Sequence, residues 1–447
     1  MTQISPIPLY QSALKESMPN LMVESALKIR KGSLVIGENR VPIDSKINIL
    51  SFGKASILMY QAAKKIIGDE YFGKGLLVTH EDRSIGRLDA NKESIVRSTH
   101  PLITKSSYVA GSEVRAFVES GSDDDILLVL ISGGGSAMVA SPVDSISPQD
   151  KIEFITRVMH MSVPEREVNI LKKSLSKIKG GRLAELTKGK VIVNCILSDE
   201  REHELSAISS GMTVCNELID PISVMDTYNL WNVAGVSIKN AILKHGRAYK
   251  VGCNKEIVNQ VIGSRDSLIE VLTRKYVEFG FDSINVLENM HSCTPSNAAE
   301  KLIGEFDRFY NLARPGKHLL VSTGEVQVDT RQISDAKGGR NQHLTALLML
   351  KYRPDFRFFF AAIATDGMDY LDGVHGAFYN SQTKHAIEEN LDFIRSSVSK
   401  FNSHKVHSML KTLLEGSKTG TNMSDFFLFT FEKKPYKNEN ENSIYCN

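Results

Sequence analysis

Short apolar runs alternate with longer amphipathic segments along the chain. In the first half, runs at 47–53, 74–80, 125–132 and 189–199 end at glycine or a polar residue, which predicts strands buried on both faces. Helical spacing predicts helices between them at 54–67, 107–120, 148–160 and 168–178, after an opening helix or helix pair within 9–30. This alternation predicts an α/β fold with a doubly wound, largely parallel sheet.

The pattern weakens near His245, and a second series of runs follows. Its segments lie at 255–263, 265–280, 281–287, 317–330, 357–367 and 425–431. We therefore expect a boundary between Lys244 and Gly252. The predicted parts are a Rossmann-like domain over 1–246, a second α/β domain with a mixed sheet over 247–435, and a polar Asn/Glu-rich tail over 436–447.

Composition narrows the possible partners. The 447 residues are 42% apolar and 24% charged, as in ordinary globular proteins, and the formal net charge is only +2. Because the basic residues are scattered, a nucleic-acid partner is not expected. The chain shows neither a signal sequence nor an apolar run of about 18 residues, so we expect a cytoplasmic protein with no membrane partner.

The five cysteines show no metal-binding spacing. They are Cys195, Cys215, Cys253, Cys293 and Cys446. Without a CxxC pair or a nearby histidine pair, they favour reduced, buried thiols.

Three consecutive glycines follow the apolar run 125–132. Gly133, Gly134, Gly135 and Ser136 thus lie at the carboxyl end of a predicted strand, the edge where open α/β sheets bind ligands. Glycine there lets backbone N–H groups approach an anion, so the loop favours a phosphate or carboxylate site. A tight strand exit without a ligand explains the same residues equally well.

Lys54 lies where the first strand of this series ends and a helix begins. Cations are unfavourable at helix N-termini unless an anion is present, so Lys54 is a candidate phosphate ligand. The surrounding residues lack the GxxxxGK[ST] pattern of a P-loop. By contrast, Gly180, Gly181 and Arg182 are explained well enough as a kink between two helices.

Carboxylates follow two other predicted strands. Asp199 ends the run 189–199, and Asp366 follows the run that begins at Arg357. At a strand end, a carboxylate can hold Mg²⁺ or accept a proton. Asp366 lies among glycines, but the later glutamate and flanking helices of an EF-hand are missing, so a calcium loop is rejected.

Arginine and glycine recur in the second half. Arg340 follows a glycine pair at the start of a predicted helix, downstream of Glu325, and can bind two oxygens of a phosphate or carboxylate. The loop 418–425 offers Asn422 and Asp425 as further polar candidates. Together these positions favour an anionic substrate and a metal in a cleft between two domains.

A series of motifs then resembles a known family. In order, they are GKA, ISGGGSA, IKGGRLA, ILSD, SSGMTV, GGRNQ, TDG and TGTN, from about Lys54 to Asp425. The series resembles the type II glycerate kinases, with an N-terminal kinase region and a C-terminal MOFRL domain. The resemblance implies transfer of a phosphoryl group from ATP, with Mg²⁺, to a hydroxyl of glycerate. We expect a monomer or a homodimer.

The resemblance also implies site residues. Lys54 and Arg340 match a family lysine and arginine and are the expected catalytic cations. Asp199 and Asp366 are the expected catalytic carboxylates, which either bind the metal or accept a proton. The positions expected to bind ATP or substrate are Gly133, Gly134, Gly135, Ser136, Gly338, Gly339, Asn341, Thr421 and Asn422.

The chain departs from the family pattern beside these motifs. The segment after ILSD reads EREHELS, His343 replaces a glutamate, Met212 replaces a proline, and only His100 and Pro101 remain of a longer motif. These departures leave open another small hydroxy acid or polyol as acceptor, or an inactive ligand-binding relative. A dehydrogenase is disfavoured because no GxGxxG follows a strand.

Overall fold

The computed structural model describes residues 5–80, 88–100, 102–161, 163–198, 205–244, 248–287, 290, 293–328 and 336–435. The chain forms two compact units. The first unit comprises Met18–Arg265 and Gly420–Asn422. The second comprises the residues up to Ser17, then Asp266–Thr419 and the residues from Met423 onward.

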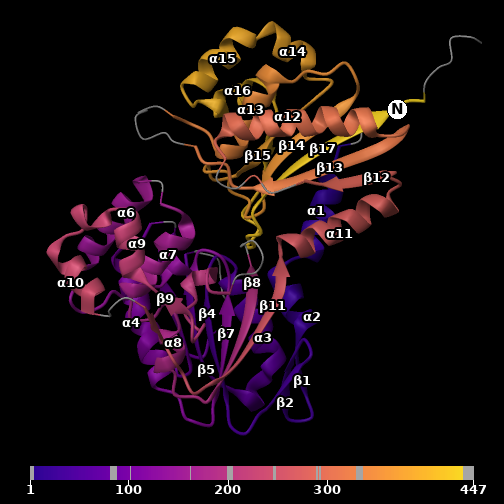
Figure 1. The fold of residues 1–447 in the computed structure, drawn as a ribbon. Coiled ribbons are helices and arrows are strands. Elements are labelled where there is room, and N and C mark those ends of the chain that lie inside the picture. The colour runs from indigo at the N-terminus through magenta and orange to yellow at the C-terminus, as the bar shows by residue number, and fades with distance from the viewer. Residues whose placement is uncertain are drawn as a thin grey trace, which may run out of the picture. The chain divides into compact units, whose positions relative to one another are not determined.

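A six-stranded sheet of order β11-β8-β7-β4-β5-β6 forms the centre of the first unit (Figure 1). Its strands are β4 (Ile47–Phe52), β5 (Phe72–Thr79), β6 (Glu93–Arg97), β7 (Ile126–Ile131), β8 (Val191–Ser198) and β11 (Glu256–Ser264). Every neighbouring pair is parallel. The doubly wound parallel sheet predicted from the sequence is therefore confirmed. The strand order reverses direction between β4 and β7, which makes their carboxyl ends the ligand-binding position of such sheets.

Helices cover this sheet, and further helices form a separate cluster. The helices are α2 (Pro19–Ala26), α3 (Ser56–Tyr71), α4 (Lys105–Glu119), α5 (Gly135–Met138), α6 (Pro148–His160), α7 (Glu165–Ser174), α8 (Arg182–Leu186), α9 (Pro221–Thr227) and α10 (Val236–Lys244). Apolar side chains of α4 and α8 pack with one face of the strands, whereas α6, α7, α9 and α10 share a core of their own. Small antiparallel sheets join β1 (Leu27–Arg30) to β2 (Ser33–Ile36) and β3 (Asn39–Pro42), and β9 (Leu218–Ile219) to β10 (Tyr249–Lys250).

The first unit extends beyond the boundary expected near residue 246. The run at 255–263, expected in the second domain, is β11, which pairs in parallel with β8 from Glu256 to Ser264. The N-terminal helix α1 (Ile7–Glu16) was expected in the first domain, but it belongs to the second unit. There the Tyr276 hydroxyl donates to the Pro6 carbonyl, 2.7 Å away.

The second unit contains the mixed sheet that the sequence predicted. Its order is β12-β13-β17-β14-β15-β16, with one parallel pair, β12 and β13. The strands are β12 (Ser283–Val286), β13 (Gly316–Gly324), β14 (Phe358–Ala364), β15 (Val374–Asn380), β16 (Leu413–Glu415) and β17 (Asp425–Lys433). The helices are α11 (Arg265–Glu278), α12 (Pro295–Leu312), α13 (Arg340–Lys351), α14 (Lys384–Glu389), α15 (Leu391–Ser399) and α16 (Ser403–Leu410). Figure 1 shows α12 to α16 over one face of this sheet, where Phe306, Phe360 and Phe429 form part of the core.

The expectation of reduced thiols throughout is wrong for two cysteines. Cys215 and Cys253, which are 38 residues apart, form a disulfide in the first unit. A spacing rule misses this pair because the fold, not the sequence, brings the segment before β11 beside the segment between β8 and β9. Cys195 and Cys293 are free thiols. Among the described residues, no helix is long and apolar enough to cross a membrane.

Candidate active site

Two loops meet at the reversal point of the parallel sheet. The first follows β4 and contains Lys54, and the second follows β7 and begins at Ser132. The Lys54 backbone N–H donates to the Gly133 carbonyl at 2.9 Å, and the buried Ser132 hydroxyl accepts from the Ala55 N–H at 3.0 Å. Two segments about 80 residues apart are thus fixed to each other. Lys54, half-buried, lies beside the glycine loop.

Close packing explains two of the three glycines. Gly134 has a φ of 85°, in the left-handed region, and a Cβ there would lie 2.8 Å from the His100 ring. A Cβ on Gly135 would lie 2.5 Å from the Ser209 hydroxyl and 2.6 Å from the Phe52 ring. His100 therefore packs on the loop, near Lys54. In the sequence it stood out only as the remnant of a longer motif.

A second group of polar residues gathers at one edge of the mixed sheet. Glu325 follows β13, Asp366 follows β14, and Asp425 begins β17. Asp425 is in register with both Gly324 and Ala364, because β17 runs antiparallel to β13 and β14. The pairing of these three strands brings the three carboxylates to the same edge.

Arg340, the first residue of α13, binds two of these carboxylates. Its Nε and Nη2 donate to the two oxygens of Asp425 at 2.5 and 3.0 Å, and its Nη1 donates to Glu325 at 3.1 Å. The Asp425 side chain is only 2% exposed, whereas that of Arg340 is 32% exposed. These bonds use three of the five guanidinium N–H groups. Within the described structure, two remain for a ligand.

Charge pairing and burial set the ionisation of this pair. Burial acts against the charge of Arg340, but Asp425 and Glu325 outweigh it and raise the pKa of Arg340. Burial raises the pKa of Asp425 to about 7, whereas Arg340 acts to lower it. Arg340 therefore stays protonated, and the ionisation of Asp425 depends on its pairing with this arginine.

The residues around Arg340 hold the start of α13. The Asp369 carboxylate accepts from the backbone N–H groups of Asn341 at 3.0 Å and Gln342 at 2.9 Å, and so caps the helix. Gly339 lets Asp369 approach, because a Cβ there would overlap its carboxylate, and Gly338 makes similar room for Ser403. The buried Asn341 side chain donates to Asp425 at 3.0 Å. Packing accounts for these three predicted ligand residues, and their binding of a nucleotide remains a prediction.

His343, a departure from the family pattern, lies in the protein interior. It is 5% exposed and stacks on Phe401 with ring centroids 4.7 Å apart. Burial lowers the pKa of His343 to about 4, so the ring is neutral at physiological pH. At this position the departure from the family pattern therefore concerns the packing of α13.

The other predicted residues have different surroundings. Asp366 is half-buried and accepts from the Met368 N–H at 3.0 Å. Thr421 and Asn422 are buried, and their contacts assign them to the first unit although both flanking segments belong to the second. Asp199 lies outside the described residues, as does most of the segment that follows ILSD. Among the residues that are described, no cluster of three or more His, Cys, Asp or Glu could hold a metal ion.

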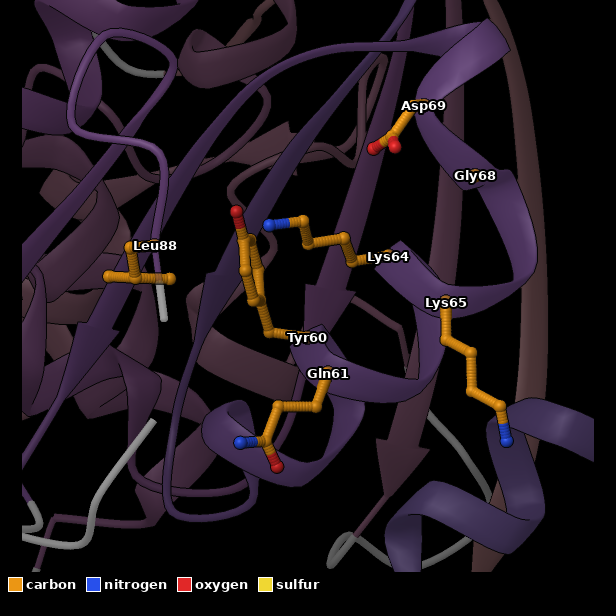
Figure 2. Close-up of a pocket in the computed structure, with 7 residues that line it drawn as sticks. All are labelled: Tyr60, Gln61, Lys64, Lys65, Gly68, Asp69 and Leu88. Carbon is orange, nitrogen blue, oxygen red and sulfur yellow. The ribbon is translucent and has the colours of Figure 1, made fainter. Parts of the chain in front are cut away.

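A hollow on the first unit involves none of the predicted residues. It has a volume of 370 Å³ and is lined by Tyr60, Gln61, Lys64, Lys65, Gly68, Asp69 and Leu88. Figure 2 shows the Lys64 amine extending toward the Tyr60 hydroxyl, while Lys65 points away. Lys64 and Tyr60 both donate to the buried Glu93, at 2.5 and 2.7 Å. Because these charges are paired within the protein, we do not assign a ligand to this hollow.

Comparisons with known proteins identify the family. The model described as "Domain of unknown function (DUF4147)" matches residues 7–243, which is more than half of the chain. The chain belongs to the DUF4147 family. The MOFRL family model matches residues 318–425 of the same protein.

Relatives of this DUF4147 protein extend over nearly its whole length. It is 26% identical to a glycerate 2-kinase of Pyrococcus horikoshii, over 94% of this chain and 95% of the relative. It is 29% identical to a glycerate 2-kinase of Sulfurisphaera tokodaii, over 90% and 95%. The crystal structure of a glycerate kinase from Thermotoga maritima has the same fold, with a TM-score of 0.77 at 21% identity, covering 95% of this chain and 98% of that structure. The resemblance to type II glycerate kinases is confirmed.

Proposed function

We propose that this DUF4147 protein transfers a phosphoryl group from ATP to the 2-hydroxyl group of glycerate, giving 2-phosphoglycerate and ADP. The observation that carries the proposal is the pair of loops at the reversal point of the parallel sheet. There Lys54 lies next to a glycine loop whose Ser136 is partly exposed. Cations and hydroxyl donors at that edge suit the anionic oxygens of a phosphate or carboxylate.

Phosphoryl transfer requires positioning and neutralisation of charge more than covalent help from the protein. In this proposal, Lys54 neutralises oxygens of the transferring group or of glycerate. Arg340 contributes its two remaining N–H groups, because its other three hold Asp425 and Glu325. Asp366 and Asp199 are the carboxylates proposed to hold Mg²⁺ or to accept the proton of the acceptor hydroxyl.

The described residues fit Mg²⁺ bound together with ATP, rather than in a site made by the protein alone. Mg²⁺ commonly binds one or two carboxylates and completes its shell with phosphate oxygens and water. Asp366 is half-buried and stands at a strand end, and within the described chain it belongs to no larger metal-binding cluster. When bound, Mg²⁺ neutralises phosphate charge.

A coupled assay of ADP release tests the proposal. D-glycerate should support turnover with ATP and Mg²⁺, the product should be 2-phosphoglycerate by NMR, and excess EDTA should stop the reaction. L-glycerate, D-lactate and glycerol serve as comparison acceptors. Lys54→Ala should lower kcat/KM by roughly 30- to 1000-fold, the loss expected for one charged contact with reacting oxygens.

The matched control is Lys28→Ala, at an exposed lysine on β1 of the same unit, which should behave as the parent protein. Turnover of another acceptor in preference to glycerate would contradict the assignment of the substrate. Absence of ADP release with every acceptor would contradict kinase activity.

A further inference from the structure

Lys179 lies behind the glycine loop, with its side chain buried. It follows α7 and is 3% exposed. Its ammonium Nζ donates to the Ser136 carbonyl at 3.0 Å, to the Ser136 hydroxyl, and to the Ser210 hydroxyl at 3.5 Å. Three acceptor oxygens thus surround a group that has three hydrogens to donate. Among the described residues no carboxylate pairs with Lys179, so these oxygens are its partners.

The segment that carries Ser210 has an unusual backbone. Ser209, Ser210 and Gly211 have φ values of 50°, 58° and 58°, and this left-handed conformation costs about 1 kcal/mol or more at each serine. The glycines that follow Lys179 hold it in place. The Gly180 N–H donates to the Ser210 carbonyl at 3.1 Å, and the Gly181 N–H donates to the Gly211 carbonyl at 2.8 Å. The segment following α7 therefore holds the Ser210 turn through both its backbone and its lysine.

The direction of one hydrogen bond follows from these contacts. The hydroxyls of Ser136 and Ser210 lie 3.0 Å apart, and either oxygen could be the donor on distance alone. Ser210 is 1% exposed, and its other partner, Lys179, is a donor. Among the described residues the Ser210 hydroxyl has no further partner, so its hydrogen would be buried without an acceptor unless it points to Ser136, and that arrangement is costly. Ser210 therefore donates to Ser136.

Ser136 is left with one hydrogen to donate. Its oxygen accepts from both Lys179 and Ser210, which occupies both lone pairs. Ser136 is partly exposed, and in the described part of the structure nothing accepts its hydrogen. The hydroxyl therefore presents a fixed donor on the exposed side of the glycine loop.

The electrostatics favour an anion at this donor. Burial, together with Lys151, Lys172 and Lys173, lowers the pKa of Lys179 well below its usual value. An anionic oxygen bound by the Ser136 hydroxyl would offset this cost, because it places negative charge two hydrogen bonds away from the ammonium.

We propose that Lys179 and Ser210 are positioning residues that fix the Ser136 hydroxyl as a donor to an anionic oxygen of the substrate. The oxygen belongs to the carboxylate of glycerate or to a phosphate of ATP. The proposal rests on the proposed kinase function, since it concerns the same loop. The sequence indicated Ser136 as a binding residue, but the positioning roles of Lys179 and Ser210 were not evident, because the glycines after Lys179 resembled a helix kink.

Binding titrations and steady-state kinetics on the full chain test this inference. Ser136→Ala should raise Kd and KM for one of the two substrates by roughly 10- to 100-fold, the usual value of a hydrogen bond to a charged group, and leave the other substrate within about twofold. If the constants for D-glycerate rise, the oxygen that Ser136 binds belongs to the carboxylate of glycerate. If the constants for ATP rise, that oxygen belongs to a phosphate. Ser210→Ala and Lys179→Met should raise the same constant.

The double variant separates positioning from general damage to the fold. If Lys179 and Ser210 act through Ser136, then Ser210→Ala should have little further effect on that constant in a Ser136→Ala background. The control is Ser174→Ala, which removes another buried hydroxyl of the same unit, one that among the described residues bonds only the Leu171 carbonyl of its own helix. It should leave both constants unchanged. Ser210→Ala removes one oxygen atom and serves as the test should Lys179→Met fail to fold.

Two failures can be told apart. If the wild-type protein binds neither ATP nor D-glycerate, the proposed function itself is wrong. If the wild type binds them and Ser136→Ala binds both equally well, only the present inference is overturned. Fully multiplicative effects of Ser136→Ala and Ser210→Ala would also overturn it.

Discussion

At the scale of single residues, Arg340 combines a proposed catalytic role with a structural one. Arg340→Ala would leave the buried Asp425 carboxylate without its main partner. We expect a loss of about 2 to 4 kcal/mol in unfolding free energy, somewhat below the cost for a fully buried pair because Arg340 is partly exposed. Chemical denaturation measures this change.

A second substitution checks the cause of that loss. Asp425→Asn in the Arg340→Ala background removes the unpaired charge and should restore part of the stability. A double variant no more stable than Arg340→Ala would show that the loss does not come from the uncompensated carboxylate.

The sequence predicts some of these residues better than others. Lys54 and the glycine loop could be predicted as site residues because the carboxyl ends of parallel strands lie at one edge of the sheet. A lysine after one strand and glycines after its neighbour in the sheet therefore come together. The pairing of Arg340 with Asp425 could not be predicted from the sequence, because the two residues are 85 positions apart and meet only through the antiparallel register of β17. Likewise, nothing in the KGG segment shows that Lys179 reaches Ser136.

At the scale of elements, the glycine loop is shaped by what packs against it. Gly135→Ala should lower kcat/KM at least about tenfold, because the added methyl group meets Ser209 and the Phe52 ring and the loop must shift. Gly304→Ala is the matched control. Gly304 lies inside α12, where a Cβ would have nothing within 4 Å, so this change should stabilise the protein by about 0.4 to 1 kcal/mol without altering kinetics. Equal kinetics for Gly135→Ala and the parent would show that the loop tolerates the shift.

Because of the buried His343 in α13, we expect the stability of the second unit to depend on pH. Burial lowers the pKa of His343 to about 4, whereas the unfolded chain has a value near 6.5. Between these values the unfolded state binds a proton that the folded state does not. The contribution of His343 to the free energy of unfolding is therefore fully present above about pH 6.5. It falls by about 3 kcal/mol as the pH drops to 4, and below that pH this group causes no further change.

His343→Phe keeps a ring to stack on Phe401. In this variant the free energy of unfolding, measured by denaturation at several pH values from 4 to 7, should fall less toward low pH than in the parent protein. His385→Gln, at an exposed histidine of α14, should leave this pH dependence unchanged. An unaltered slope in His343→Phe would assign the acid sensitivity to other groups, such as the buried His407, whose pKa is also lowered to about 4 by burial.

The assignment of elements to units shows where pattern reading ends. An apolar run such as 255–263 predicts a strand but does not say which sheet it joins, and here β11 completes the first sheet by pairing with β8. The opening helix raises the same difficulty, since α1 packs in the second unit through the contact of Tyr10 with Phe426. Strand and helix types follow from local periodicity, whereas these assignments depend on contacts between distant segments.

At the scale of the whole molecule, Lys54 belongs to the first unit and Arg340 to the second. Kinetics can decide whether both act on the same bound substrate. Arg340→Lys suits this test better than the alanine variant, because it keeps a cation beside Asp425 while losing the planar fork that binds two oxygens. We expect kcat/KM to fall roughly 30- to 1000-fold in Lys54→Ala and about 10- to 100-fold in Arg340→Lys.

If both cations stabilise one transition state, the double variant should be clearly less impaired than the product of the two single effects, because once one contact is lost the other can no longer act at full strength. Melting temperatures of all three variants serve as the control, since a shared loss of folding would imitate this result. Purely multiplicative losses at unchanged stability would mean that the two residues act independently. An Arg340→Lys variant with parent kinetics would leave that arginine only its structural role of holding Asp425 and Glu325.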